Sequence, residues 1–170
     1  MIRVWDPLVR VLHWTLVSAV ALAALSVWAL FEAHQPAGYV ALGAVLLRAL
    51  WGFVGSGHAR FSAFVRGPRE TVGYACALVR GREPRYLGHN PLGACMVLAL
   101  MLCVIGLAVS GWLYTSDAMW GDERVELVHL SLAWALLGLV CLHVAGVIFT
   151  SLRHHENLVR AMFDGSKREH

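Results

Sequence analysis

One long uncharged stretch limits what this chain can fold into. From Leu127 to Thr150 it contains no Asp, Glu, Lys or Arg, and about 20 apolar residues in a helix cross the ~30 Å hydrocarbon core of a bilayer. His129 and His143 lie inside this stretch. They are 14 residues apart, so in a helix both rings project from nearly the same face, about 21 Å apart along the axis. Ionisable side chains within a membrane span are candidates for a functional site.

The composition is typical of a membrane protein. Of the 170 residues, 58% are hydrophobic and 15% are charged, whereas soluble domains carry about 25% charged residues. The four cysteines form no C-x-x-C and no C-x-x-C-H motif. We therefore expect no disulfide framework, no zinc site of the usual spacing and no covalently attached haem.

Four apolar runs predict an all-α membrane protein. They cover about residues 8–31, 37–54, 91–114 and 125–150, and each is close to the ~20 residues that a transmembrane helix needs. We expect one membrane domain over residues 1–170, built as a four-transmembrane-helix bundle. A loop at 55–90 and a tail at 151–170 complete it.

The distribution of Lys and Arg predicts the orientation. The N-terminus, the loop at 55–90 and the tail are rich in Arg, whereas the other two connections hold one arginine between them beside several acidic residues. Because Lys and Arg gather on the cytoplasmic side of membrane proteins, both termini and the long loop are expected to be cytoplasmic. Within that loop, the residues after Pro68 predict a short helix along the membrane interface, and a solvated basic loop is the equal alternative.

Four histidines fall into two levels once the helices are oriented. His13 and His143 lie toward the cytoplasmic ends of their helices, and His34 and His129 lie toward the outer ends. Two imidazoles facing each other at equal depth across a helix bundle are the arrangement of axial haem ligation. The alternative for any one of them is a hydrogen-bonded packing residue.

Two neighbours of these histidines fit a haem site. Gly38 follows His34 by one turn on the same face and leaves room, although glycine is also common in membrane helices for close packing. Arg48 lies on that face at the inner level, where it could pair with a haem propionate or raise the haem potential. Snorkelling to the cytoplasmic interface is the equal alternative for Arg48.

Several motifs, taken in the order in which they occur along the chain, resemble those of one family. The sequence is similar to the bacterial cytochrome b561 and nickel-iron-hydrogenase b-type cytochrome superfamily, and most similar to its small stand-alone members. The motifs are R-x-x-H-W from Arg10, H-x-x-x-G from His34, the RALWGFVG run, GHNPLG from Gly88, His129 with His143, and the HHENLVRAM tail.

This resemblance implies a four-helix cytochrome of the bacterial inner membrane with two non-covalent haem b groups. The family ligand positions match His13, His34, His129 and His143. Hydrogenase-type members work beside a catalytic subunit, so a hydrogenase-like or other respiratory complex is one alternative role.

The function expected is electron transfer between the quinone pool and a periplasmic redox partner such as a c-type cytochrome. A second alternative is a superoxide:quinone oxidoreductase, and a third is a non-redox membrane module whose histidines bind metal or pack. The partners expected are membrane lipids and quinone, and no nucleic acid.

A quinone site is expected at the inner end of the third run. His89, with Arg10 or Arg85 nearby, could bond a quinone carbonyl. The alternative for His89 is an interfacial capping residue before Asn90 and Pro91.

Overall fold

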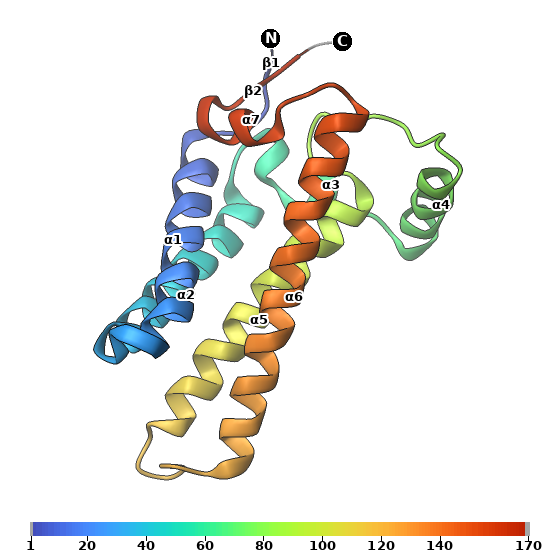
Figure 1. Ribbon diagram of the computed structural model, residues 1–170. Coiled ribbons are helices and arrows are strands. Elements are labelled where there is room, and N and C mark those ends of the chain that lie inside the picture. Colours follow the sequence, from blue (N-terminus) through green and yellow to red (C-terminus); the bar gives the residue numbers. More distant parts are fainter. Residues whose placement is uncertain (1, 169–170) are drawn as a thin grey trace. The chain divides into compact units, whose positions relative to one another are not determined.

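The described part of the chain, residues 2–168 of a computed structural model, contains four helices long and apolar enough to cross a membrane (Figure 1). They are α1 (Pro7–Ala29), α2 (Phe31–Val54), α5 (Pro91–Tyr114) and α6 (Glu123–Arg153). The most apolar part of α5 has a mean hydropathy of 2.8, the highest of the four. The prediction of four apolar spans is confirmed.

Large apolar side chains on these helices point away from the protein. Leu25 is 69% exposed, Trp134 67% and Leu142 60%. Exposing such surface to water costs about 25 cal/mol per Å², whereas hydrocarbon chains solvate it at no such cost. The exposure therefore fits helices that face lipid.

The connection between α1 and α2 is shorter than the sequence suggested. The apolar run that predicts the second helix begins at about residue 37. Instead, α2 begins at Phe31 and runs through Pro36, and only Leu30 separates it from α1. The Leu30 amide donates to the Ser26 carbonyl at 2.9 Å. His34 consequently lies in the first turn of α2 and not in a loop.

The segment between α2 and α5 has structure of its own. It contains a 3₁₀ turn η1 (Gly57–Ala59) and the helices α3 (Phe61–Phe64) and α4 (Pro68–Val79). The short helix expected after Pro68 is therefore present. After α6 the chain forms α7 (Leu158–Asp164), and the strand β2 (Ser166–Lys167) pairs antiparallel with β1 (Ile2–Arg3).

The chain forms two compact units, which are described separately. The terminal unit comprises the described parts of residues 1–10, 49–98 and 141–170, and the central unit comprises residues 11–48 and 99–140. The terminal unit contains η1, α3, α4, α7 and both strands. The central unit consists of segments of the four long helices with the two connections that join them.

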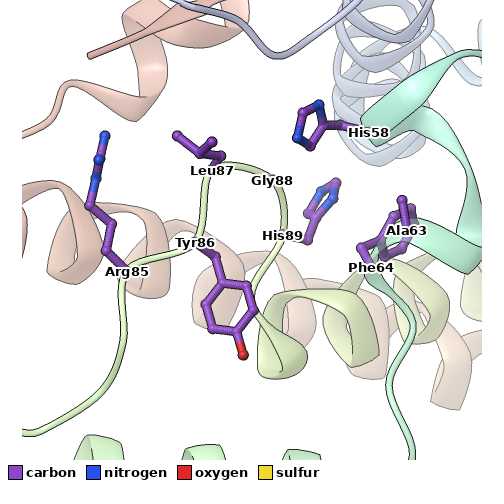
Figure 2. Close-up of a pocket in the computed structure, with 8 residues that line it drawn as sticks. All are labelled: His58, Ala63, Phe64, Arg85, Tyr86, Leu87, Gly88 and His89. Atoms are coloured by element: carbon purple, nitrogen blue, oxygen red, sulfur yellow. The ribbon is translucent and has the colours of Figure 1, made fainter. Parts of the chain in front are cut away.

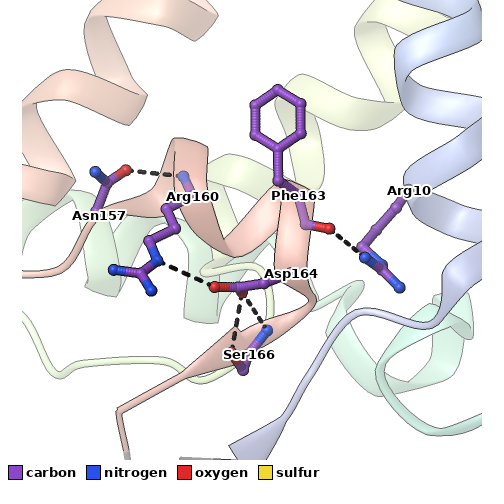
Figure 3. A network of polar contacts seen from close by, with 6 residues as sticks. All are labelled: Arg10, Asn157, Arg160, Phe163, Asp164 and Ser166. Carbon is purple, nitrogen blue, oxygen red and sulfur yellow. Dashed lines mark hydrogen bonds and ion pairs between the residues drawn. The ribbon is translucent and has the colours of Figure 1, made fainter.

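In the terminal unit, α7 and β2 form what we call the C-terminal strap, which packs on the N-terminal residues. The Gly165 carbonyl accepts the amides of Val4 (2.9 Å) and Trp5 (3.1 Å), and Arg10 donates to the Phe163 carbonyl (Figure 3). The buried cluster beneath contains Val4 and Trp5, each at most 7% exposed. Gly165 ends α7 with φ 81°, a conformation that favours glycine.

Polar contacts within the strap hold its shape. The Asn157 side chain accepts the Arg160 amide at 2.8 Å and so caps α7, and Asp164 accepts from both the amide and the hydroxyl of Ser166 (Figure 3). These hydrogen bonds lower the pKa of Asp164, with a smaller contribution from Arg160. The strap is therefore ordered by its own polar side chains as well as by its contacts with Val4, Trp5 and Arg10.

Candidate functional site

His34 is oriented by a backbone group of the neighbouring helix. It lies half-buried in α2, and its Nδ1 is 2.8 Å from the Ala23 carbonyl oxygen of α1. A carbonyl oxygen only accepts, so Nδ1 carries the proton and donates it. The lone pair of the ring is then on Nε2, which is the nitrogen available in this tautomer to ligate a metal.

His129 is oriented in the same way by a serine. Its Nδ1 lies 3.0 Å from Oγ of Ser110 in α5, and Ser110 itself is 5% exposed. The Ser110 hydroxyl already donates its one proton to the Leu107 carbonyl at 3.1 Å. With the hydroxyl proton directed at that carbonyl, the Ser110 oxygen accepts from Nδ1–H of His129, and the ring lone pair is again on Nε2.

The rings of His34 and His129 lie together in the central unit. Their centroids are 6.1 Å apart with an interplanar angle of 68°. A metal ion bonded to two imidazoles lies about 2 Å from each nitrogen, which places centroids on opposite sides of the metal about 6 Å apart. The observed spacing therefore fits a pair of axial ligands. Residues 2–168 hold no group of three or more His, Cys, Asp or Glu side chains that could bind a metal ion, but a haem needs only two protein ligands because the macrocycle supplies the rest.

Glycines adjoin this histidine pair. A Cβ added at Gly38, one turn after His34, would meet no atom within 4 Å. A Cβ added at Gly111 would lie 3.2 Å from Cε1 of His129, tighter than ordinary van der Waals contact. Gly111 therefore allows α5 to approach the His129 ring closely, and Gly38 leaves space beside His34.

The other two predicted ligands lie on long helices, each half-buried. His13 lies in α1, within the central unit, and its ring meets Trp14 edge to face with centroids 5.4 Å apart. His143 lies in α6, in the part that belongs to the terminal unit. The pairing of His13 with His143 stays a prediction from sequence. Arg48 is half-buried in α2, and its role beside a haem likewise stays a prediction.

His89 lines a pocket in the terminal unit. Figure 2 shows the hollow, about 320 Å³, between the loop at 85–89 and the η1–α3 segment. Trp5 and Phe64 pack against the His89 ring with centroid distances of 4.7 and 4.8 Å. The pocket is lined by His58, Ala63, Phe64, Arg85, Tyr86, Leu87, Gly88 and His89. Its volume is at the lower end of the range for small-molecule sites.

The two arginines considered as partners of His89 have different positions. Arg85 lines the pocket, pairs with Glu156 and donates to the Arg168 carbonyl. Arg10 is not among the pocket residues, and it donates instead to the Phe163 carbonyl of the strap. Of the two, Arg85 is therefore the residue that shares a pocket with His89.

Asn90 caps α5. Its Oδ1 accepts the Gly93 amide at 2.7 Å, as an N-cap side chain does. The alternative expected from the sequence for His89 was a helix-capping role. In the structure, the next residue, Asn90, performs that role.

Sequence reasoning missed the groups that orient the two histidines. Ser110 is one of few hydroxyl side chains in α5, and a buried serine one or two turns from a helix end could have been flagged as a hydrogen-bonding partner. The partner of His34 is the backbone carbonyl of Ala23, so no side chain in the sequence indicates it. Its role follows only from the tight α1–α2 connection.

A hydrogen-bond cluster around the half-buried Asp6 was also missed. Its carboxylate accepts from Trp51 Nε1 (2.8 Å), the Ser56 hydroxyl (3.1 Å) and the Val9 amide (2.9 Å). Burial acts to raise the pKa of Asp6, but these hydrogen bonds together hold it below the ordinary value of 3.8. Asp6 thereby joins the start of α1 to the end of α2 within the terminal unit.

Comparison with known proteins identifies the family. The profile of the prokaryotic cytochrome b561 family matches residues 4–165. This chain belongs to that family. Membership indicates a b-type cytochrome of a membrane, with haem b as cofactor.

A curated relative gives a more specific likeness. The chain is 26% identical over 160 residues to a probable Ni/Fe-hydrogenase B-type cytochrome subunit of Rhizobium leguminosarum bv. viciae. The match covers 79% of this chain and 66% of the relative, so the chain spans just under two thirds of that protein's length. No solved structure matches.

Proposed function

We propose that the protein is a di-haem cytochrome that carries electrons between the quinone pool and a periplasmic redox partner such as a c-type cytochrome. The observation that supports this most is the pair of His34 and His129 rings, 6.1 Å apart, each with its Nδ1 engaged. The two rings would be the axial ligands of an outer haem b. His13 and His143 would be the ligands of an inner one.

The protein's part in this chemistry is to set the ligands and their surroundings. A haem supplies reversible one-electron reduction of its iron when bound. The Ala23 carbonyl and Ser110 hold the rings in one tautomer and increase the basicity of Nε2, as partners of metal-bound histidines commonly do. Arg48 would pair with a propionate of the inner haem and so favour its reduced state.

The His89 pocket is our candidate for the quinone headgroup. His89 and Arg85 offer hydrogen-bond donors for the two carbonyls of a quinone, and Phe64, Leu87 and Tyr86 line the hollow around them. Arg10 would act indirectly, by fixing the strap next to Trp5.

The arginine-rich segments support an orientation with both termini and the loop at 55–90 on the cytoplasmic side of a bacterial inner membrane. By the depths expected from the sequence, His89 at the inner end of the third span is then cytoplasmic, and His34 and His129 lie toward the periplasm. Electrons then cross the membrane between the two haems.

The curated relative favours a second role, that of a membrane subunit in a hydrogenase-like complex. Its name places it with a hydrogenase, and this chain would then accept electrons from a catalytic subunit in place of a diffusing partner. Copurification of the tagged protein from its native membrane separates the two roles, because only the complex retains a stoichiometric partner subunit. Reduction of the haems by superoxide alone would favour a superoxide:quinone oxidoreductase.

The test of the main proposal is the haem content and reactivity of the purified protein. We expect two haem b per chain by pyridine haemochrome assay, reduction of both by a quinol, and reoxidation by a soluble cytochrome c. One haem or none per chain would contradict the di-haem proposal. Two haems that no quinol reduces would contradict the quinone assignment alone.

A further inference from the structure

Helix α4 presents an apolar face that the described residues leave largely exposed. Val72 is 63% exposed and Val79 89% exposed, and Cys76 between them is exposed as well. Positions 72, 76 and 79 follow the i, i+4, i+7 spacing of one helix face. Figure 1 shows α4 (green) as a separate short helix, joined by extended segments to its neighbours in the sequence.

The opposite face of α4 is fixed to the protein. Tyr74 is 6% exposed, and its ring meets Tyr86 edge to face with centroids 5.6 Å apart. Burial raises the pKa of the Tyr74 hydroxyl, with added effects of Glu83 and Tyr86. Because one face is anchored in this way, the direction of the Val72–Val79 face is set by packing.

Arginines flank this apolar face. Arg66, Arg69, Arg80 and Arg82 precede, begin or follow α4, and all four are exposed. The one acidic residue among them, Glu70, lies 3.9 Å from Arg66. An apolar stripe bordered by arginines suits an anionic surface with an apolar interior better than it suits water.

The C-terminal end of α4 is held at the end of a membrane span. Arg153, the last residue of α6, donates to the Gly81 carbonyl at 2.7 Å and pairs with Glu83 at 2.9 Å. The contact with Arg153 lowers the pKa of Glu83. Since α6 is long and apolar enough to span a bilayer and ends at Arg153, the segment that follows α4 lies where that span leaves the hydrocarbon.

We propose that α4 is a lipid-binding helix that lies in the membrane interface and selects anionic phospholipids. Val72, Cys76 and Val79 enter the acyl region, and Arg66, Arg69, Arg80 and Arg82 contact the headgroup phosphates. The inference is independent of the quinone site, since it uses none of the pocket residues to bind lipid.

The first test measures where Cys76 lies. A nitroxide is attached to Cys76 in the full chain with Cys95, Cys103 and Cys141 replaced by serine, in nanodiscs of phosphatidylcholine with phosphatidylglycerol. We expect collisions with oxygen, which concentrates in lipid, to exceed those with a water-soluble nickel chelate. The matched control carries Cys76→Ser and Glu70→Cys, whose label lies on the far side of the helix and should show the reverse order.

The second test removes the charges. Replacement of the four arginines by glutamine should lower the preference of the protein for spin-labelled phosphatidylglycerol over phosphatidylcholine, by about fivefold for each arginine that contacts lipid. Lysine replacements keep the charge and should keep the preference. Far-UV circular dichroism verifies that each variant is folded.

Three results would overturn the proposal. The first is a Cys76 label as accessible to the chelate as the label at position 70. The second is a label shielded from both reagents, which would mean that a protein surface or a second copy covers α4. The third is a lipid preference that stays unchanged when the four arginines are replaced by glutamine.

Discussion

The central and terminal units are stabilised in different ways. In the central unit, side-chain hydrogen bonds lie within or between neighbouring long helices and their connections, and those at His34 and His129 orient the two rings. In the terminal unit, ion pairs and side-chain hydrogen bonds join segments far apart in the sequence, such as Arg85 to Glu156 and Trp51 to Asp6. In the central unit, two of the described hydrogen bonds therefore orient the candidate ligands, whereas in the terminal unit polar contacts join distant segments and hold the fold.

This difference predicts where substitutions affect the haem and where they affect stability. Changes at the polar atoms of the central unit should alter cofactor binding while leaving the helices in place. Changes in the terminal unit should alter stability while leaving the outer haem bound.

The largest effect is expected from loss of a ligand in the central unit. His34→Ala and His129→Ala should each lower the haem content from two to one per chain, because either change removes one of the two iron bonds that would hold the outer haem between its helices. The measurement is the pyridine haemochrome assay on purified protein. His154→Ala, outside the proposed ligand set, is the control and should retain both haems; retention of both in the two ligand variants would refute the pairing of His34 with His129.

A smaller effect is expected from the group that orients His129. Ser110→Ala removes the hydroxyl acceptor of the Nδ1 proton, and losses of this kind typically weaken metal-site affinity about 10- to 100-fold. Transfer of haem to excess apomyoglobin measures the change. The control is Ser116→Ala, because the Ser116 hydroxyl donates to the nearby Leu113 carbonyl and makes no hydrogen bond to a candidate ligand. Equal transfer rates in the two variants would argue against the role of Ser110.

In the terminal unit, the strap should be sensitive at Gly165. Gly165→Ala places a side chain at φ 81° and its Cβ 2.7 Å from the Trp5 carbonyl oxygen, so we expect a loss of about 1–3 kcal/mol of stability. Thermal unfolding followed by circular dichroism detects it, with the outer haem retained below the transition. Gly67→Ala, where φ is −67° and a Cβ meets no atom within 4 Å, should leave the midpoint almost unchanged.

The smallest effect is a pH dependence that arises at Asp6. Its pKa is lower in the folded protein than the ordinary 3.8, so its contribution to stability is fully present above the unfolded pKa and is lost as the pH falls through the folded pKa. Asp6→Asn should reduce the loss of stability on acidification. Trp51→Phe removes one of the hydrogen bonds to Asp6 and should reduce it in part; an identical acid response in all three proteins would contradict this role.

How far the sequence predicted the structure depends on the physical signal involved. The four spans were predictable because apolar runs of membrane length have few alternative folds. The start of α2 was placed too late because the polar residues Glu32, His34 and Gln35 precede the apolar run, whereas the chain turns within one residue at Leu30. That error bore on His34, which the structure places inside the helix.

The details of the candidate site were less predictable. The histidines themselves could be proposed from their depth and spacing, but the Ala23 carbonyl has no sequence signature and Ser110 has only a weak one. The strap contacts, such as Arg10 with Phe163, join residues that are distant in the sequence and carry no pattern of their own. Tertiary packing alone brings these groups together.

The central claim is that two histidine side chains hold each haem. Near-infrared magnetic circular dichroism of the oxidised wild-type protein tests it most directly, because the low-spin charge-transfer band reports the axial ligands. We predict bis-imidazole ligation at both haems, with the signal halved in His34→Ala. A high-spin haem in the wild type, or a histidine–methionine band at either site, would contradict the account.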